Sequence, residues 1–227
     1  MNSLVPALRE SIFNPTYEIA AEFVEIGIDA VLESDALKGI PIVNSIAALC
    51  KVGYNLHERN LIKQTLSFIL GYNAGTISRE CIEAHQIELT DNPRKAEKEL
   101  GRVLIILDKH VEVIQSQVMG SFYGAYSRGD VTWEKFCELS EANRRMFLSD
   151  YHILIEAAMN EGLNIEDREL YQVDRLISLG LLQNSNRLGG SVVIDLDNPG
   201  EEGKDIIVTS FGKTFCEYLP AITFSEL

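Results

Sequence analysis

The fold is decided by two segments near the end of the chain, LYQVDRLISLGLL at Leu170–Leu182 and IIVTSFGKTFCEYL at Ile206–Leu219. In the first segment apolar residues recur every three to four positions and Gly180 follows the last turn, which is typical of a helix ending at a glycine. The second begins with a β-branched run and continues as a helical pattern behind Thr209 or Ser210 as its N-cap. The expected order is therefore helix, strand, strand, helix, with Asp167–Leu179 as the first helix.

Between these two helices the sequence predicts strands and one exposed turn. Leu181–Asn184 and Ser191–Leu196 are expected to be strands, and Asp205–Val208 is expected to be the returning strand. The turn, DNPGEEG at Asp197–Gly203, consists of residues that favour tight turns. We call this turn the wing.

The preceding part of the chain predicts a series of helices. Residues 1–15 have weak periodicity and two prolines, and we expect an arm with at most a short helix. The clearest start signal is Asp91 or Asn92 as N-cap followed by Pro93, and the helix behind it is expected to continue to Arg128. In its second half Gly120 and Gly124 permit another helix to approach closely. The expected helices are Tyr17–Leu32, residues 39–53, Asn55–Tyr72, Ser78–Leu89, Pro93–Arg128, Trp133–Ala142 and Met146–Ala158.

Composition and charge restrict the class of protein. The 227 residues are 46% apolar and 24% charged, as in ordinary soluble globular proteins. The four cysteines form no CxxC pair, and the N-terminus shows no basic segment followed by an apolar run. A cytoplasmic protein with reduced thiols is expected. The net charge of −14 disfavours binding to a phosphate backbone.

The two deciding segments resemble winged-helix domains through RLISLGLL at Arg175–Leu182 and IVTSFGKTF at Ile207–Phe215. Together with the helices expected from periodicity, this resemblance implies a mainly α protein. It has a multi-helix N-terminal body over residues 1–140 and a C-terminal winged-helix-like α+β module over residues 141–227, packed either as two domains or as one unit. Winged-helix regulators usually read DNA with the helix before the wing, which here corresponds to Asp167–Ser178.

The charges on this module differ from those of a DNA-binding surface. Between residues 160 and 205 four bases stand against ten acids, a net charge of −6, and the wing tip carries Glu201 and Glu202. Carboxylates repel a polyanion, so nucleic acid is disfavoured as a partner. Other protein chains, a second copy of this chain included, are the expected partners. The expected contact residues are Tyr171, Arg175, Glu201 and Glu202, together with exposed positions of helix 93–128.

The N-terminal body resembles a group of uncharacterised prokaryotic proteins that accompany mobile elements or phage-defence loci. The resemblance rests on ESDALKGIPIV at Glu33–Val43, HERNLIKQTLSFI at His57–Ile69 and GDVTWEKFCEL at Gly129–Leu139. It implies a role in antiviral defence or in a mobile-element system. No functional residues are carried over from it.

The sequence offers no catalytic motif. Gly212-Lys213-Thr214 has the last three letters of a P-loop, but the glycine required further upstream is replaced by Ile207. The four histidines lack the spacing of metal ligands, and the acidic residues of the wing lack the order of a calcium loop. We therefore expect no cofactor, no metal and no enzymatic activity, although an enzyme of unrecognised type stays open.

These observations favour a non-enzymatic protein-binding or assembly subunit. One alternative is a membrane-acting effector that uses the apolar helix 39–53, because this segment is apolar on most faces. We favour burial in a protein core for it. The other alternative is a winged-helix DNA-binding regulator.

Overall fold

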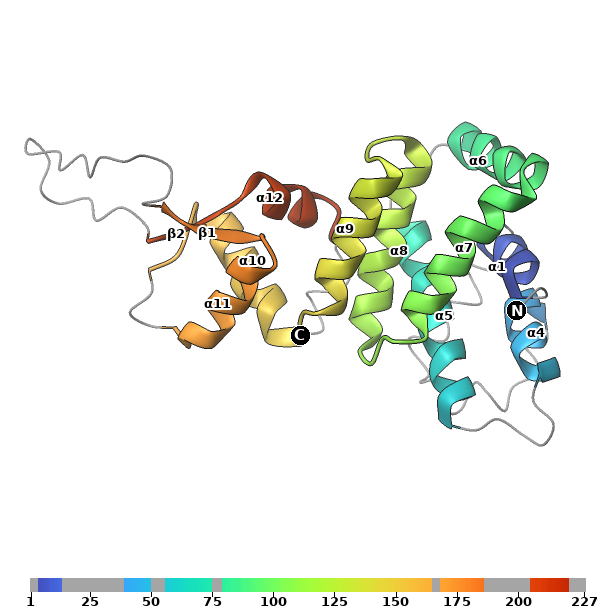
Figure 1. Cartoon of the computed structure of the whole chain (residues 1–227), viewed down its shortest axis with the longest axis horizontal. Coiled ribbons are helices and arrows are strands. Elements are labelled where there is room, and N and C mark those ends of the chain that lie inside the picture. Colours follow the sequence, from blue (N-terminus) through green and yellow to red (C-terminus); the bar gives the residue numbers. More distant parts are fainter. Residues whose placement is uncertain are drawn as a thin grey trace, which may run out of the picture. The chain divides into compact units, whose positions relative to one another are not determined.

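The computed structural model describes residues 4–13, 39–49, 56–74, 79–164, 168–185 and 205–220. Within these ranges the protein is mainly α, with ten helices that account for 78% of the residues and a small two-stranded antiparallel sheet near the C-terminus (Figure 1). The described residues form two compact units, one up to Arg144 together with Pro220, the other Arg145–Leu219.

The first unit is built around a close pair of helices, α5 (Leu56–Ala74) and α8 (Val113–Arg128). A Cβ atom added to Gly120 would lie 2.1 Å from the carbonyl oxygen of Phe68, and one added to Gly71 would lie 1.8 Å from that of Gln117. No side chain fits at either position, so the two backbones touch. The close approach expected at Gly120 is confirmed.

Aromatic side chains fill the space beside this pair. Phe68 and Tyr72 of α5 meet Tyr123 of α8, which also contacts Phe136 of α9 (Trp133–Arg144) edge to face at 5.5 Å. All four are buried. Large rings that bury their whole surface contribute strongly to core stability, and this layer joins three helices.

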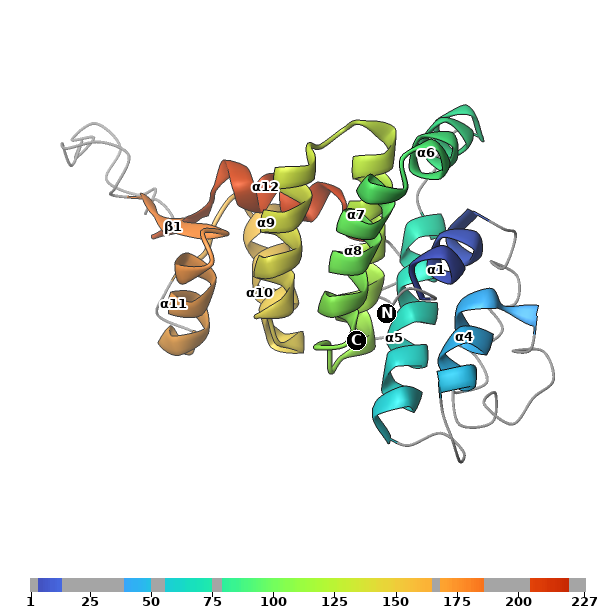
Figure 2. The ribbon, with the colours of Figure 1, turned by 45° about the vertical axis from the view of Figure 1, so that its right-hand side comes forward.

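Residues 4–13 form the short helix that the sequence allowed, but they belong to the core of the first unit, so the expectation of an arm is wrong. Helix α1 (Leu4–Phe13) buries Leu8 and Ile12 and packs against α4 (Pro41–Leu49), beside α5 (Figure 2). The Ser11 hydroxyl accepts a hydrogen bond from the Ile42 N–H at 3.0 Å. The weak apolar periodicity and the proline made this helix hard to recognise in the sequence. Pro6 is compatible with it because a proline in the first turn loses no helical hydrogen bond.

Helix α4 corresponds to the middle of the expected helix 39–53. Its apolar residues Ile42, Val43 and Ile46 are buried against α1 and α5, as expected for a core helix. Over the described stretches of the chain, no helix has both the length and the apolar content that crossing a bilayer requires.

The expected helix Pro93–Arg128 is wrong, because it is two helices. Helix α7 spans Pro93–Leu107 and α8 begins at Val113. The Gln115 side chain accepts hydrogen bonds from the backbone N–H groups of Val111 and Glu112, which caps the start of α8. Val111, whose position continues the apolar spacing of α7, lies in the break and is 76% exposed.

Helix α6 (Arg79–Asp91) precedes α7 with a single residue between them. Asn92 is the N-cap of α7, its side chain accepting from the Lys95 N–H at 3.1 Å, and Pro93 opens the helix. This start signal is confirmed.

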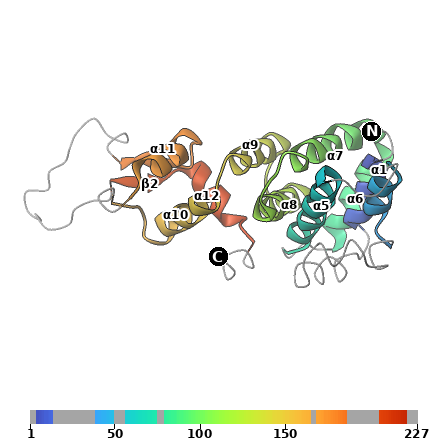
Figure 3. The same cartoon turned by 90° about the horizontal axis from the view of Figure 1, so that it is seen from below.

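The second unit contains α10 (Leu148–Met159), α11 (Leu170–Ser178), the strands β1 (Leu182–Asn184) and β2 (Ile206–Val208), and α12 (Ser210–Glu217). The strands pair antiparallel with Leu182 opposite Val208, and a bridge joins Leu163 to Ile206. Helix α10 packs against α11, α12 and β2 (Figure 3).

Two positions of this unit require glycine, each for a different structural reason. Gly180 has φ of +75°, the left-handed conformation that ends α11 and that glycine adopts without strain. A Cβ on Gly212 would lie 2.1 Å from the carbonyl oxygen of Leu181, so α12 packs directly on the backbone before β1. Thr209 accepts from the Gly212 N–H at 2.9 Å and caps α12, as expected. The glycine of the P-loop-like sequence Gly212-Lys213-Thr214 is therefore explained by helix packing and capping.

Several expected elements lie outside the described residues. They are the helix Tyr17–Leu32, the strand Ser191–Leu196 and the wing Asp197–Gly203 with Glu201 and Glu202.

Candidate functional site: an arginine between two aromatic side chains

Arg175 of α11 is held by a buried carboxylate. Its Nε lies 2.8 Å from Asp150 Oδ2 and its Nη2 lies 2.6 Å from Oδ1, so the guanidinium forms a two-pronged ion pair. Asp150 is fully buried in the first turn of α10 and also accepts the Phe147 N–H at 2.8 Å. The hydrogen bonds to Asp150 raise the pKa of the Arg175 guanidinium above its ordinary value, although partial burial opposes this.

Two exposed aromatic rings lie on this guanidinium. Arg175 Cζ is 4.6 Å from the ring centre of Phe147 and 5.6 Å from that of Tyr171. Phe147 is 62% exposed and Tyr171 is 60% exposed, which is unusual for rings of this size. Because the cation below them is fixed by Asp150, each ring rests on a rigid support. We call these four residues the aromatic–arginine cluster.

Apolar and acidic residues surround this cluster. Leu170 and Leu148 are exposed in the first turns of α11 and α10, and Glu169 and Asp174 of the α11 segment are exposed as well. The Gln172 amide donates to the Ser149 hydroxyl at 3.2 Å and ties α11 to α10 beside the cluster. The surface is therefore apolar in its middle and negative along α11.

The structure brings together two of the four predicted contact residues. Tyr171 and Arg175 are one helical turn apart and form the cluster, whereas Glu201 and Glu202 are outside the described residues. Arg168, another base of this region, forms an ion pair with Glu156. Arg168 and Arg175 are thus both neutralised by carboxylates of the same unit. The exposed residues predicted along helix 93–128 now belong to two separate helices.

Sequence reasoning missed Phe147 and Asp150. The available signal was the order Phe147-Leu148-Ser149-Asp150 before an apolar helix, since an acid at the third helical position commonly bonds back to the N-cap. Nothing in the sequence shows that this acid also meets an arginine twenty-five positions later.

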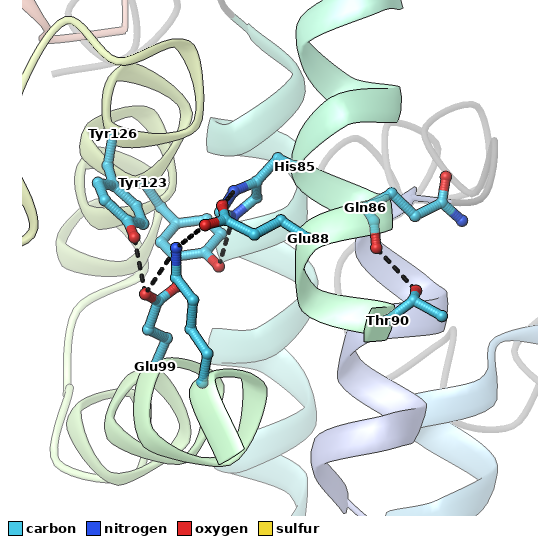
Figure 4. Close-up of polar contacts among 8 residues, drawn as sticks. His85, Gln86, Glu88, Thr90, Glu99, Tyr123 and Tyr126 are labelled. Atoms are coloured by element: carbon cyan, nitrogen blue, oxygen red, sulfur yellow. Dashed lines mark hydrogen bonds and ion pairs between the residues drawn. The ribbon is translucent and has the colours of Figure 1, made fainter. Parts of the chain in front are cut away.

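A second group of polar side chains, also missed, lies inside the first unit. The α6–α8 polar cluster comprises His85, Glu88, Lys95, Glu99, Tyr123 and Tyr126 from α6, α7 and α8 (Figure 4). His85 Nε2 is 3.1 Å from the Tyr123 hydroxyl, and Tyr126 donates to Glu99 Oε1 at 2.7 Å. In the sequence these residues are spread over three expected helices, and none of them forms a motif.

Glu99 is the least satisfied member of this cluster. It is 4% exposed, and its Oε2 atom is buried without a hydrogen-bond partner among the residues that the structure describes. Lys95 Nζ lies 3.7 Å from Oε1 and also pairs with Glu88. Burial raises the pKa of the Glu99 carboxyl, and the hydrogen bond from Tyr126 and the charge of Lys95 oppose that rise.

In the described ranges of the chain, no three His, Cys, Asp or Glu side chains are grouped so that they could hold a metal ion. Comparison with known proteins adds no assignment, because no family model, no curated protein and no solved structure matches the chain.

Proposed function

We propose that this protein is a non-enzymatic binding or assembly subunit whose aromatic–arginine cluster docks on another protein chain. The single observation that carries the proposal is the pair of exposed rings of Phe147 and Tyr171 on a fixed guanidinium. Aromatic side chains and arginine dominate the binding energy of protein interfaces. Rings that are already held in place lose little conformational entropy when a partner binds.

The charges around the cluster define the partner. Arg175 and Arg168 are paired with Asp150 and Glu156, so neither guanidinium is available as a strong phosphate ligand. The exposed Glu169 and Asp174 favour a partner with Lys or Arg beside an apolar side chain. This supports a protein surface over nucleic acid.

The proposal includes a winged-helix-like arrangement for the second unit. The order α11, β1, β2, α12 and the antiparallel pairing of the strands support it. The helix that such domains usually place on DNA is α11, and here its exposed surface carries Tyr171 beside Glu169 and Asp174. The same arrangement would then present its recognition helix to a polypeptide. A place in a prokaryotic defence or mobile-element system is part of the proposal and rests on the resemblance of the N-terminal segments.

The test is to select ligands from a displayed random peptide library on the immobilised full-length chain and to measure each synthetic peptide by fluorescence anisotropy. We expect peptides with an apolar residue next to Lys or Arg, and we expect Tyr171→Ala to weaken them about 30-fold, as for a central interface aromatic. Analytical ultracentrifugation of the same variants tests a second copy of the chain as the partner.

The matched control is Met159→Ala, because Met159 is 79% exposed on α10 and is no part of the cluster. Its affinity should stay within about twofold of the wild-type value, as for surface positions outside a hot spot. A random-sequence DNA duplex at low salt is measured beside the peptides. Tight and salt-sensitive duplex binding, or peptide binding that is indifferent to Tyr171→Ala, would contradict the proposal.

A further inference from the structure

Helix α6 is attached to the first unit through very few buried side chains. Of residues 80–91 only His85 and Leu89 are buried, while Cys81 and Ile82 are half-buried and the others are exposed. Arg9 of α1 donates to the Leu89 carbonyl at 3.2 Å. An apolar side chain normally fills such an anchoring position, but in α6 one of the two anchors is a titratable ring.

His85 is enclosed by three neighbouring helices. Its ring is 6.0 Å from Phe13 of α1, and on α8 it is 5.7 Å from Tyr123 and 5.5 Å from Tyr126, centre to centre. The ionisable groups around it are Glu88 on α6, Lys95 and Glu99 on α7, and Tyr123 and Tyr126 on α8 (Figure 4). His85 itself is 6% exposed.

The direction of the hydrogen bond between His85 Nε2 and the Tyr123 hydroxyl depends on where the ring carries its proton. The Tyr123 hydroxyl can donate to Nε2 only while that nitrogen carries no proton. When Nε2 is protonated it must donate instead, and the hydroxyl hydrogen of the fully buried Tyr123 then has to turn away from the ring. Protonation therefore places a charge in the core and also forces a buried hydroxyl to reorient.

The surroundings oppose that charge. Burial lowers the pKa of His85 to about 4, with Lys95 adding to the effect, while the partly exposed Glu88 opposes it from 3.6 Å. Glu88 is already paired with Lys95, which limits what it can offer to His85.

We propose that α6 is a pH-sensitive element of this protein, released from α7 and α8 when His85 takes up a proton. The α5–α8 pair stays folded in the released state, because its contact at Gly71 and Gly120 involves no residue of α6. Release uncovers the rings of Tyr123 and Tyr126, which His85 contacts, and it takes Glu88 away from Lys95, the partner of Glu99.

The direction of the effect follows from the two protonation states. A solvated histidine has its ordinary pKa of 6.5, so the proton binds the released helix more tightly than the attached one. Between pH 7.5 and pH 5.5 this raises the ratio of released to attached helix about tenfold. Glu99 acts in the opposite sense, since its pKa is raised in the attached state. A variant that lacks only the titrating ring separates the two contributions.

The experiment measures amide hydrogen exchange of the full chain by mass spectrometry at pH 7.5 and 5.5, corrected for the intrinsic exchange rate. Peptides covering 79–91 report α6, and peptides covering 113–128 report α8. We compare the wild type with His85→Gln, whose amide oxygen can still accept from Tyr123, and with His152→Gln, which removes an exposed histidine. The opening ratio of α6 should rise about tenfold more in the wild type than in His85→Gln. His152→Gln should behave as the wild type.

An equal pH response in the wild type and His85→Gln would overturn the proposal, as would simultaneous loss of protection in α6 and α8. If His85→Gln does not fold, the wild-type chain decides the question. Its one tryptophan, Trp133, lies 5.4 Å from Tyr126, so its emission should change over the same pH range as α6 protection. Protection of α6 that does not respond to pH would then refute the release of this helix.

Discussion

Asp150 and Glu99 are both buried carboxylates, one in each unit, and they are treated differently by their surroundings. Asp150 has both oxygens engaged, by the fork of Arg175 and by the Phe147 N–H. Glu99 has one oxygen bonded to Tyr126 and the other without a hydrogen-bond partner among the described residues. A fully bonded carboxylate fixes the geometry around it, whereas a buried oxygen without a donor costs free energy. The first kind supports a rigid docking surface and the second a region that can change.

The largest effect should come from removing the cation beside Asp150. Arg175→Met keeps most of the apolar stem but leaves a fully buried carboxylate without its counter-ion, which should cost about 3 kcal/mol of unfolding free energy. Urea denaturation of the full chain, followed by circular dichroism, measures the loss.

The control for this variant is Arg168→Met. Arg168 and Glu156 are both partly exposed, so breaking their pair should cost no more than about 1 kcal/mol. Equal losses for the two variants would mean that the buried Asp150 carboxylate does not depend on Arg175 for its stability.

The sequence predicted the regular elements of both units better than their connections. Asn92-Pro93, Thr209 and Gly180 each have a local physical role, and each ends or begins a helix where expected. The break at residues 108–112 was not predictable from periodicity, because Val111 and Ile114 continue the apolar spacing. The turn is fixed from outside the helix. The Gln64 amide donates to the Val111 carbonyl at 3.1 Å, and Asn60 donates to that of His110 at 3.0 Å.

The candidate site was predictable in part. Tyr171 and Arg175 were both expected as contact residues on the same helix, and in the structure the Arg175 guanidinium lies 5.6 Å from the Tyr171 ring. Asp150 and Phe147 come from a different helix, and which side chains meet across helices depends on packing that one sequence does not show. The α6–α8 polar cluster was missed for the same reason, since its members come from three helices.

A smaller effect is expected from Tyr126→Phe, which removes the hydroxyl that donates to Glu99. The variant keeps the ring and its contact with Trp133, and it leaves both oxygens of the buried carboxylate without a donor other than Lys95. The loss should be about 1–2 kcal/mol at pH 7. Denaturant unfolding measures the loss from Tyr126→Phe in the wild-type chain and again in the Glu99→Gln chain. The loss should be smaller in the Glu99→Gln chain, and an equal loss in both would show that Glu99 does not depend on this bond.

The smallest effect should come from Glu99→Gln, and its sign is informative. Burial raises the pKa of Glu99 in the folded chain, so the folded state binds the proton more tightly than the unfolded state and the wild type loses stability as pH rises from 4.5 through the raised value. Glutamine carries no charge and is free of this loss. The variant should therefore stay within about 1 kcal/mol of the wild type at pH 7, and its stability should rise relative to the wild type as pH rises through that window.

Unfolding midpoints of both chains at several pH values measure this trend. His85 contributes to the pH dependence of both chains, so their difference isolates the carboxyl. A constant difference at all pH values would mean that burial does not raise the pKa of Glu99, and the case for an unsatisfied carboxylate in the first unit would fall.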